Sequence, residues 1–415
     1  SASGEPLESV GGAHFDIAAR SLQWVFFCVG LPVGTLVPRL AEIKAGLGAG
    51  NAAYGTAIAI GGAGAILGNW LGGRLTHALG SKRLAQLGIG LLLIPNIANA
   101  LAPSVGWLAV VAFAAGFTFS TNNIALNSQA VLIEQGLGRS YIPRAHAAWS
   151  LGTMSSGLIS SLMAPHSTPV QALAVGAVIS FSIYQWAARG LLATEHEDRP
   201  SEDDSQLQRH EPIPPAAKRF LIILALAQTL ALVAEMSTGD WSSVLLKQEF
   251  HIPVGPNGYA FTSFMLIQLI SRLQATKLID RFGMQRTIRT FGIAGTVGYL
   301  ACLLGASLAS ERSQLTSLIL SCLAYASLGA AVGPMPAAFT TAAGSIPGLP
   351  SARALAFSGI VIALSGMIGR IAFANLAQVL PLTLALAGMG LLVLVTVSMT
   401  FVLVPERAEQ HAIRR

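Results

Sequence analysis

The chain contains two copies of one segment, and this internal repeat constrains the fold more than any other feature. Residues 42–83 and 245–286 align without a gap at an offset of 203 positions. Equivalent residues recur in the pairs Lys44 and Lys247, Gly55 and Gly258, Leu75 and Leu278, Gly80 and Gly283, and Arg83 and Arg286. Each copy is a polar loop, an apolar helix and a short basic turn. The repeat predicts two similar halves that pack together.

The composition indicates that these halves lie in a membrane. Hydrophobic residues make up 53% of the chain and charged residues only 11%, whereas soluble domains carry about 25% charged residues. The net charge of +6 follows the topology described below and does not indicate nucleic-acid binding. The three cysteines lie in apolar runs, so the sequence predicts no disulfide framework and no metal site.

Twelve apolar segments are each long enough to cross about 30 Å of hydrocarbon as a helix. We expect them near 18–38, 52–76, 84–102, 105–133, 145–164, 169–192, 219–246, 257–279, 287–309, 315–343, 354–378 and 380–404. The predicted fold is an all-α membrane protein with twelve transmembrane helices in two pseudo-symmetric six-helix bundles, 18–192 and 219–404. Proline should break the first helix at Pro32 and the tenth at Pro334 and Pro336. Gly64, Gly68 and Gly72 should let another helix approach the second one closely.

The basic residues orient the predicted helices. When both termini are placed in the cytoplasm, most of the 25 Lys and Arg residues fall on the cytoplasmic side, as the positive-inside rule requires. Outside the bundles we expect a disordered cytoplasmic N-terminus (1–17), an acidic cytoplasmic linker that contains proline (193–218) and a cytoplasmic tail (405–415).

The basic turns resemble the loop signature of the major facilitator superfamily, Gly-x-x-x-Asp-Arg-x-Gly-x-(Arg/Lys)-Arg. The second turn matches this signature at Asp280, Arg281, Gly283 and Arg286. The first turn fits at Gly73, Gly80, Lys82 and Arg83, but His77 and Ala78 replace the Asp-Arg pair. The family uses this Asp in a cytoplasmic charge network that latches the two halves. The resemblance therefore implies the major facilitator fold with an asymmetric latch.

A finer resemblance is to bacterial proteins near the fucose-permease-like proton symporters. It rests on the strings Pro38–Lys44, Asn127–Ala130 followed by Glu134, Gly138–Arg139, and Ala234–Glu235 followed by Asp240–Trp241. It implies a transporter of the bacterial inner membrane that moves a small polar solute, such as a sugar or related metabolite, by alternating access with proton coupling. A proton-coupled exporter of drugs or metabolites is the alternative. A receptor or lipid-handling protein on the same fold is a third reading.

Ionisable side chains inside a membrane are costly and need an explanation. Glu235 lies roughly 22 Å from the inner face in the seventh helix, and Arg370 lies at a similar depth in the eleventh. We interpret Glu235, with Asp240 as the second candidate, as the proton-coupling carboxylate; the alternative is a static ion pair. Arg370 could hold an anionic solute or neutralise Glu235. We expect Arg39 within reach of Asp240 or Glu235.

Asparagines supply the remaining candidates for solute binding. Asn123 and Asn127 are four residues apart in the fourth helix and share one face, on which their amides could bind hydroxyl- or amide-bearing solutes. Hydrogen bonding between helices is the equally weighted alternative. Together with Arg370, Arg39 and Trp241, these two residues form the predicted substrate site.

Gate and latch residues are expected at the cytoplasmic ends of the helices. We assign this role to Asp280, Arg281, Gly283, Arg286, Glu134, Arg139 and Arg272. The sequence shows no nucleotide-binding loop and no nucleophile with a paired base, so neither ATP-driven transport nor enzymatic catalysis is expected, and no cofactor is predicted. The expected partners are a small-molecule substrate, protons and the lipid bilayer, with the protein acting as a monomer.

Overall fold

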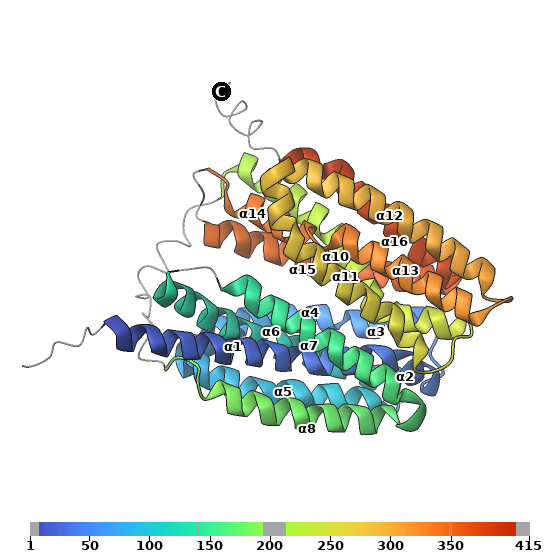
Figure 1. Cartoon of the computed structure of the whole chain (residues 1–415), viewed down its shortest axis with the longest axis horizontal. Coiled ribbons are helices and arrows are strands. Elements are labelled where there is room, and N and C mark those ends of the chain that lie inside the picture. The colour runs from blue at the N-terminus through green and yellow to red at the C-terminus, as the bar shows by residue number, and fades with distance from the viewer. Residues whose placement is uncertain (1–7, 139–140, 194–212, 348, 350, 404–415) are drawn as a thin grey trace, which may run out of the picture.

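The computed structural model describes residues 8–138, 141–193, 213–347, 349 and 351–403, and it is helical in both halves (Figure 1). The first half comprises α1 (Glu8–Leu36), η1 (Val37–Arg39), α2 (Leu40–Gly46), α3 (Asn51–Ala59), α4 (Gly61–Leu79), α5 (Ser81–Ala100), α6 (Val105–Leu137), α7 (Ile142–Met163), η2 (Ala164–His166) and α8 (Pro169–Ala188).

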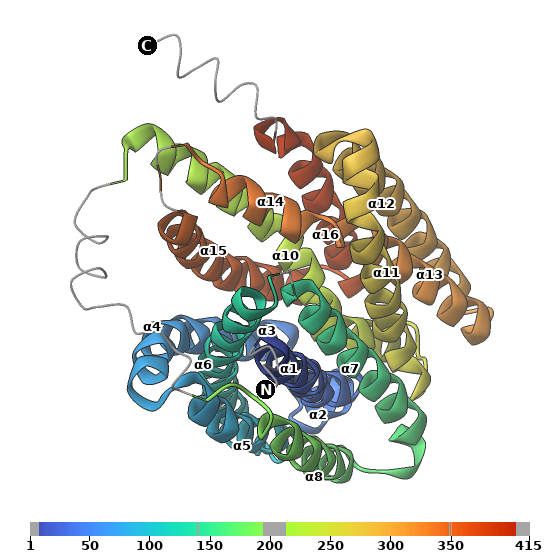
Figure 2. The same cartoon turned by 60° about the vertical axis from the view of Figure 1, so that its left-hand side comes forward.

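The second half repeats this order of long and short helices. It comprises α10 (Pro215–Gln248), η4 (Pro256–Gly258), α11 (Tyr259–Phe282), α12 (Met284–Ala309), α13 (Gln314–Val332), α14 (Met335–Gly344), α15 (Ser351–Val379), α16 (Leu382–Ser398) and η5 (Met399–Leu403). Each of the twelve predicted segments coincides with one helix or with a broken pair of helices. The predicted all-α fold of two six-helix bundles is therefore confirmed (Figure 2).

Length and apolarity mark eight of the described helices as candidate membrane spans. The large apolar side chains on the outside of the bundles agree with this, since Trp186 is 64% and Leu308 is 69% exposed. In water such exposure would be costly, whereas hydrocarbon accepts it. The structure is therefore that of an integral membrane protein.

Helix breaks follow the predictions in part. The tenth segment breaks between α13 and α14 at Gly333 and Pro334, as expected. In contrast, α1 continues through Pro32, and the prediction of a break there is wrong. Pro32 has no N–H to donate to the carbonyl of Cys28 one turn earlier, and this carbonyl accepts instead from the Ser180 hydroxyl of α8 over 2.8 Å. The second segment is split at Ile60 into α3 and α4.

Of the segments predicted outside the bundles, the N-terminal one differs from the prediction. Helix α1 begins at Glu8, so the expectation of disorder through residue 17 is wrong. The ring of Phe15 packs against Gly136 of α6 and extends α1 beyond the predicted boundary. Most of the predicted linker, residues 194–212, lies outside the described residues, as does the predicted tail; the end of the linker belongs to α10.

The two ends of the bundle are distinguished by the chain. Helix α1 begins, α8 ends and α10 begins at the end on the left of Figure 1, and η5 packs beside α10 and α14 there. We call this the terminal end. The opposite end carries η1, α2 and α3 of the first half and η4 of the second half. The repeat thus places equivalent helix starts together at the end far from the termini.

Glycine sets the distance between α4 and α6, as the stripe of small residues predicted. A Cβ atom on Gly64 would lie 1.9 Å from the carbonyl oxygen of Phe113, and one on Gly68 would lie 2.4 Å from that of Phe117. On the same helix, a Cβ atom on Gly73 would meet nothing within 4 Å. Gly64 and Gly73 therefore form a matched pair for substitution.

We expect Gly64→Ala to lower the free energy of unfolding by about 1–3 kcal/mol, because the added methyl group forces α4 away from α6. Gly73→Ala should leave stability unchanged or raise it by up to about 1 kcal/mol, because alanine restricts the unfolded chain. Thermal unfolding of both variants in the same detergent tests this expectation. Equal stabilities would contradict the close approach of the two helices.

Candidate functional site

The repeated segments meet across the two halves at the end far from the termini. A Cβ atom on Gly55 of α3 would lie 2.6 Å from the Trp241 ring of α10. A Cβ atom on Gly258 would lie 2.7 Å from the Cβ of Pro38. Both pairs obey the repeat offset of 203, since Gly55 corresponds to Gly258 and Pro38 to Trp241. The same contact is thus made twice, with the halves exchanged.

Hydrogen bonds also join the halves, and two of them have equivalent acceptors. Ser243 donates to the carbonyl of Val37 over 3.0 Å, and the Tyr54 hydroxyl donates to the carbonyl of Asp240 over 3.4 Å. Val37 and Asp240 are equivalent in the repeat. Asn51 and the backbone of Ala52 also bond to the end of α15. We call these contacts and the two glycine contacts the clasp.

Every described hydrogen bond between the halves belongs to the clasp. In addition, Val37, Ala41, Tyr54 and Ala57 of the first half belong to the apolar core of the second. The halves are therefore joined at the end far from the termini.

Trp241 lies inside the clasp and is 2% exposed. Its ring makes edge-to-face contacts with Tyr54 and Phe373, at centroid distances of 5.3 and 5.4 Å. Such contacts add to the stabilisation from burial. The structure thus places this predicted substrate residue in the seal between the halves, where no solute reaches it in this conformation.

Arg370 of α15 pairs with Asp240 of α10. Nε and Nη2 both donate to one carboxylate oxygen, over 2.9 and 2.6 Å. The two side chains are 11% and 18% exposed, which is low for an ion pair. Arg370 therefore neutralises Asp240 and not Glu235, which corrects the expected pairing, and the pair braces α10 against α15 beside the clasp.

The expected contact of Arg39 with Asp240 or Glu235 is wrong. Arg39 is fully buried, and its Nη1 donates to Glu42 over 2.8 Å. Its Nη2 donates to the carbonyl and hydroxyl oxygens of Ser167 in the turn before α8. The 3-10 turn η1 bends the chain after α1 and carries the guanidinium towards that turn, away from the second half. Arg39 therefore fixes η1 within the first half and presents no surface to a solute.

Glu235 pairs with Arg272, a partner that the sequence analysis assigned to the latch. Nη2 of Arg272 lies 3.1 Å from one carboxylate oxygen and 3.4 Å from the other. A count of residues could have found this pair: Glu235 precedes the end of α10 by as many residues as Arg272 follows the start of α11, so both lie roughly 20 Å from the same end. Arg272 is thus a partner of the intramembrane acid, which corrects its predicted role.

Helical spacing places this pair on the seam between the halves. Phe261 of α11 lies against Gly157 of α7 and Gly239 of α10. Arg272 is about three turns from Phe261 on α11, and Glu235 is about one turn from Gly239 on α10. His146 is likewise about three turns from Gly157 on α7, and it interacts electrostatically with Arg272. The three ionisable groups therefore face one another on the terminal side of the Phe261 contact.

The Glu235 and Arg272 side chains are 19% and 31% exposed, and His146 is exposed. The seam is sealed at the clasp but leaves these groups accessible farther in. An accessible ion pair in the middle of a membrane protein is the usual mark of a solute or ion pathway.

Helix α6 uses its three asparagines differently. Asn122 is buried against Gly88 of α5 and accepts from Tyr184 of α8 over 3.3 Å, so it packs the first half. Asn123 and Asn127 are half-buried on another face, and the Asn127 amide donates to the carbonyl of Asn123. Among the described hydrogen bonds, neither side chain reaches another helix. The predicted role of these two side chains in binding a solute remains a prediction.

The basic turns of the repeat have the same backbone in both halves. Gly80 and Gly283 have φ of 80° and 83°, where a side chain would be strained, and each donates to a carbonyl four residues earlier. Asp280, Arg281 and Arg286 are exposed, and their carboxylate and guanidinium groups make no described hydrogen bond. The predicted latch residues are thus in place at the terminal end, but the described contacts do not connect them to the first half.

Glu134 closes the connection between α6 and α7. Its carboxylate accepts from the backbone N–H groups of Tyr141 and Ile142, at the start of α7. A carboxylate at this place stabilises the start of a helix. The predicted gate residue therefore has a capping role in this structure. Arg139 lies outside the described residues.

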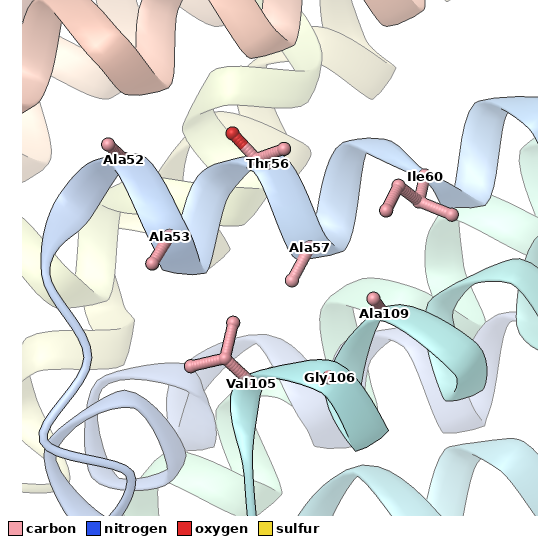
Figure 3. Close-up of a pocket in the computed structure, with 8 residues that line it drawn as sticks. All are labelled: Ala52, Ala53, Thr56, Ala57, Ile60, Val105, Gly106 and Ala109. Carbon is pink, nitrogen blue, oxygen red and sulfur yellow. The ribbon is translucent and has the colours of Figure 1, made fainter.

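A shallow hollow between α3 and α6 is almost entirely apolar (Figure 3). Ala53, Ala57, Val105 and Ala109 line it from the two helices, and Thr56 is the polar residue among those that border it. Both helices belong to the first half, so this hollow is separate from the seam. Its lining does not suit a polar solute.

Comparison with known proteins identifies the family. The model of the Major Facilitator Superfamily matches residues 24–369. The chain belongs to this superfamily. An uncharacterised transporter of Sinorhizobium fredii is 25% identical over 385 residues, which cover 90% of this chain and 94% of the relative.

Solved structures show the same fold. A D-xylose–proton symporter superposes with a TM-score of 0.69 at 13% identity, over 94% of this chain and 97% of that one. The nucleoside transporter NupG superposes with a TM-score of 0.68 at 13% identity, over 92% of this chain and 98% of that one. These structures share the fold, and the family match and the relative from Sinorhizobium fredii make the protein a major facilitator transporter.

The two ion pairs of the second half should differ in their contribution to stability. We expect Arg370→Gln to lower the free energy of unfolding by about 3–5 kcal/mol, because it removes an arginine that is only 11% exposed and donates to Asp240 through two nitrogens. Arg272→Gln should cost only about 0–1 kcal/mol, because the Arg272 side chain is 31% exposed and reaches Glu235 through one nitrogen. Thermal unfolding in detergent compares the variants. The Asp240→Asn/Arg370→Gln double variant should lose less than the two single losses combined; additive losses would contradict a direct pair.

Proposed function

We propose that this protein is a proton-coupled secondary transporter that moves a small polar solute by alternating access across the bacterial inner membrane. It acts as a monomer with both termini in the cytoplasm. The observation that carries the proposal is the accessible Glu235–Arg272 pair on a seam that is closed at one end by the clasp.

The clasp supports alternating access because it is confined to one end. Its contacts relate equivalent residues of the two halves, so a rocking movement that separates one contact also separates the other. The basic turns at the terminal end carry the family's latch signature, which would close that end when the clasp opens. The structure then corresponds to the state that is open to the cytoplasm.

Glu235 is the acid best placed to carry the proton. Its carboxylate lies about midway along the seam, is partly exposed and has one basic partner. Asp240, the second candidate, is held by two hydrogen bonds from Arg370 beside the closed clasp. Glu134 caps α7, and Asp280 lies at the cytoplasmic turn.

A polar solute fits the groups along the seam. The half-buried amides of Asn123 and Asn127 offer donors and acceptors from the first half, while Glu235 and Arg272 offer charges from the second. The solved relatives that resemble the fold are named as xylose and nucleoside transporters. A lipid-handling protein would instead need an apolar opening between the halves, and the apolar hollow beside α3 lies within the first half.

Glu235→Gln should abolish accumulation driven by a pH gradient, because glutamine mimics the protonated acid permanently. Exchange of solute across the membrane should persist, since it needs no net proton movement. Transport is measured in proteoliposomes with a solute identified by thermal-shift screening of the purified protein. Glu311→Gln, an exposed acid in the turn after α12, serves as the matched control. Gradient-driven accumulation by Glu235→Gln would show that coupling lies elsewhere.

A reversible cross-link should test the rocking movement. The Cβ position of Gly62 in α4 lies 3.0 Å from the Cβ of Met367 in α15, which is close to disulfide geometry across the halves. In a background without Cys28, Cys302 and Cys322, oxidation of the Gly62→Cys/Met367→Cys variant should reduce transport at least about tenfold, and reduction should restore it, because the bond prevents the halves from separating. Each single cysteine variant should remain active. Full transport by the cross-linked protein would contradict alternating access.

A further inference from the structure

The three arginines paired within the membrane-spanning helices differ in how many of their N–H donors are occupied. Arg39 uses Nη1 and Nη2, while its Nε is buried without a hydrogen-bond partner. Arg370 uses Nε and Nη2 on Asp240. Arg272 uses only Nη2 in the described contacts, although a guanidinium carries five N–H donors.

Accessibility separates Arg272 from the other two in the same way. Its side chain is 31% exposed, compared with 11% for Arg370 and none for Arg39. The Nε and Nη1 atoms of Arg272 are not among the buried polar atoms that lack a partner. Arg272 therefore presents unoccupied donors to the accessible part of the seam, in the planar arrangement that suits a carboxylate.

The free donors of Arg272 could bind an anion, and the charge balance of the site favours this. Glu235 and Arg272 together carry no net charge, and a lone charge at this depth is costly. If Glu235 takes up a proton, the Arg272 charge loses its partner. A neutral solute would leave that cation uncompensated, whereas a solute with one negative charge would restore neutrality. The pair can thus exchange an ionised Glu235 for a proton together with an anion without changing the net charge of the site.

We propose that the transported solute carries a carboxylate that Arg272 binds when Glu235 is protonated. The inference rests on the proposed proton-coupled transport and specifies the chemical class of its solute. Proton and anion enter together because their charges cancel. The proton neutralises Glu235 and so frees the Arg272 guanidinium, and the carboxylate of the solute then neutralises the guanidinium. Arg272 is the anchor for the anion.

The charged groups around the pair agree with an anion site. His146 of α7 faces Arg272 across the seam, and it carries no negative charge in either protonation state. Farther along α11 towards the terminal end lie Lys277 and the Asp280–Arg281 turn, while Asp240 on the clasp side is neutralised by Arg370. Glu235 is therefore the acid that competes for Arg272, and its protonation is what admits the carboxylate.

Matched ligands test the proposal directly. Binding to the purified full-length protein is measured at pH 5.5 and 7.5 for galacturonate with galactose, glucuronate with glucose, and lactate with lactamide. We expect at least one acid to bind more tightly than its neutral partner, and more tightly at the lower pH. Arg272→Gln should weaken this binding about 10- to 100-fold, and Arg272→Lys should weaken it less. Lys277→Gln removes an equal charge from the same helix and should have little effect.

Glu235→Gln supplies a readout that a purely structural role for Arg272 would not change. Because the competing charge is removed, acid binding to this variant should be tight at both pH values. The proposal is overturned if no acid of the panel binds more tightly than its neutral partner, or if Arg272→Gln binds the acid as the unmodified protein does.

The two proposals fail in different ways. A neutral sugar that is concentrated by a pH gradient in a Glu235-dependent manner would overturn the anion site and leave proton-coupled transport intact. An acid that binds through Arg272 but is never concentrated by the gradient would overturn proton-coupled transport and leave the anion site intact.

Discussion

The contact of each repeat with the opposite half is the constraint on which the rest of the structure depends. Gly55 lies against Trp241, and Gly258 lies against Pro38, because glycine alone leaves room for these side chains. The contacts bring the two halves together at one end and leave the seam free farther in. The depth at which Glu235 and Arg272 become accessible follows from where this seal stops.

Ion pairs have different roles on the two sides of this seal. Beside the clasp, Arg370 donates twice to one carboxylate oxygen of Asp240. Arg39 is buried and bonds Glu42 and Ser167. These charges fix helices to one another. Beyond the seal, both carboxylate oxygens of Glu235 accept from one nitrogen of Arg272, and the two side chains remain partly exposed. Geometry and not residue type separates a brace from a site that can change its partner.

Sequence reasoning found the elements that depend on local pattern and missed those that depend on pairing. Hydrophobic length predicted the helical segments, and the repeat predicted equivalent turns at Gly80 and Gly283. The charged residues were found individually, but their partners were assigned wrongly because the twist and tilt of the helices decide which side chains meet. Arg39 was misplaced because η1 turns its side chain back into the first half, which no periodicity records. Pro32 was misread because a hydroxyl from α8 bonds the Cys28 carbonyl that the proline leaves without a partner.

The placement of the ion pairs has an electrical consequence. Asp240–Arg370 and Glu235–Arg272 both lie within the second half, and each sums to zero charge. Moving one elementary charge through the membrane field requires about 2.3 kcal/mol per 100 mV, so a half that carries balanced pairs can rock without working against the membrane potential. The clasp itself is made of glycine contacts, aromatic rings and backbone carbonyls, which add no charge to that movement. In the proposed cycle, the return of the empty carrier would therefore not depend on the membrane potential.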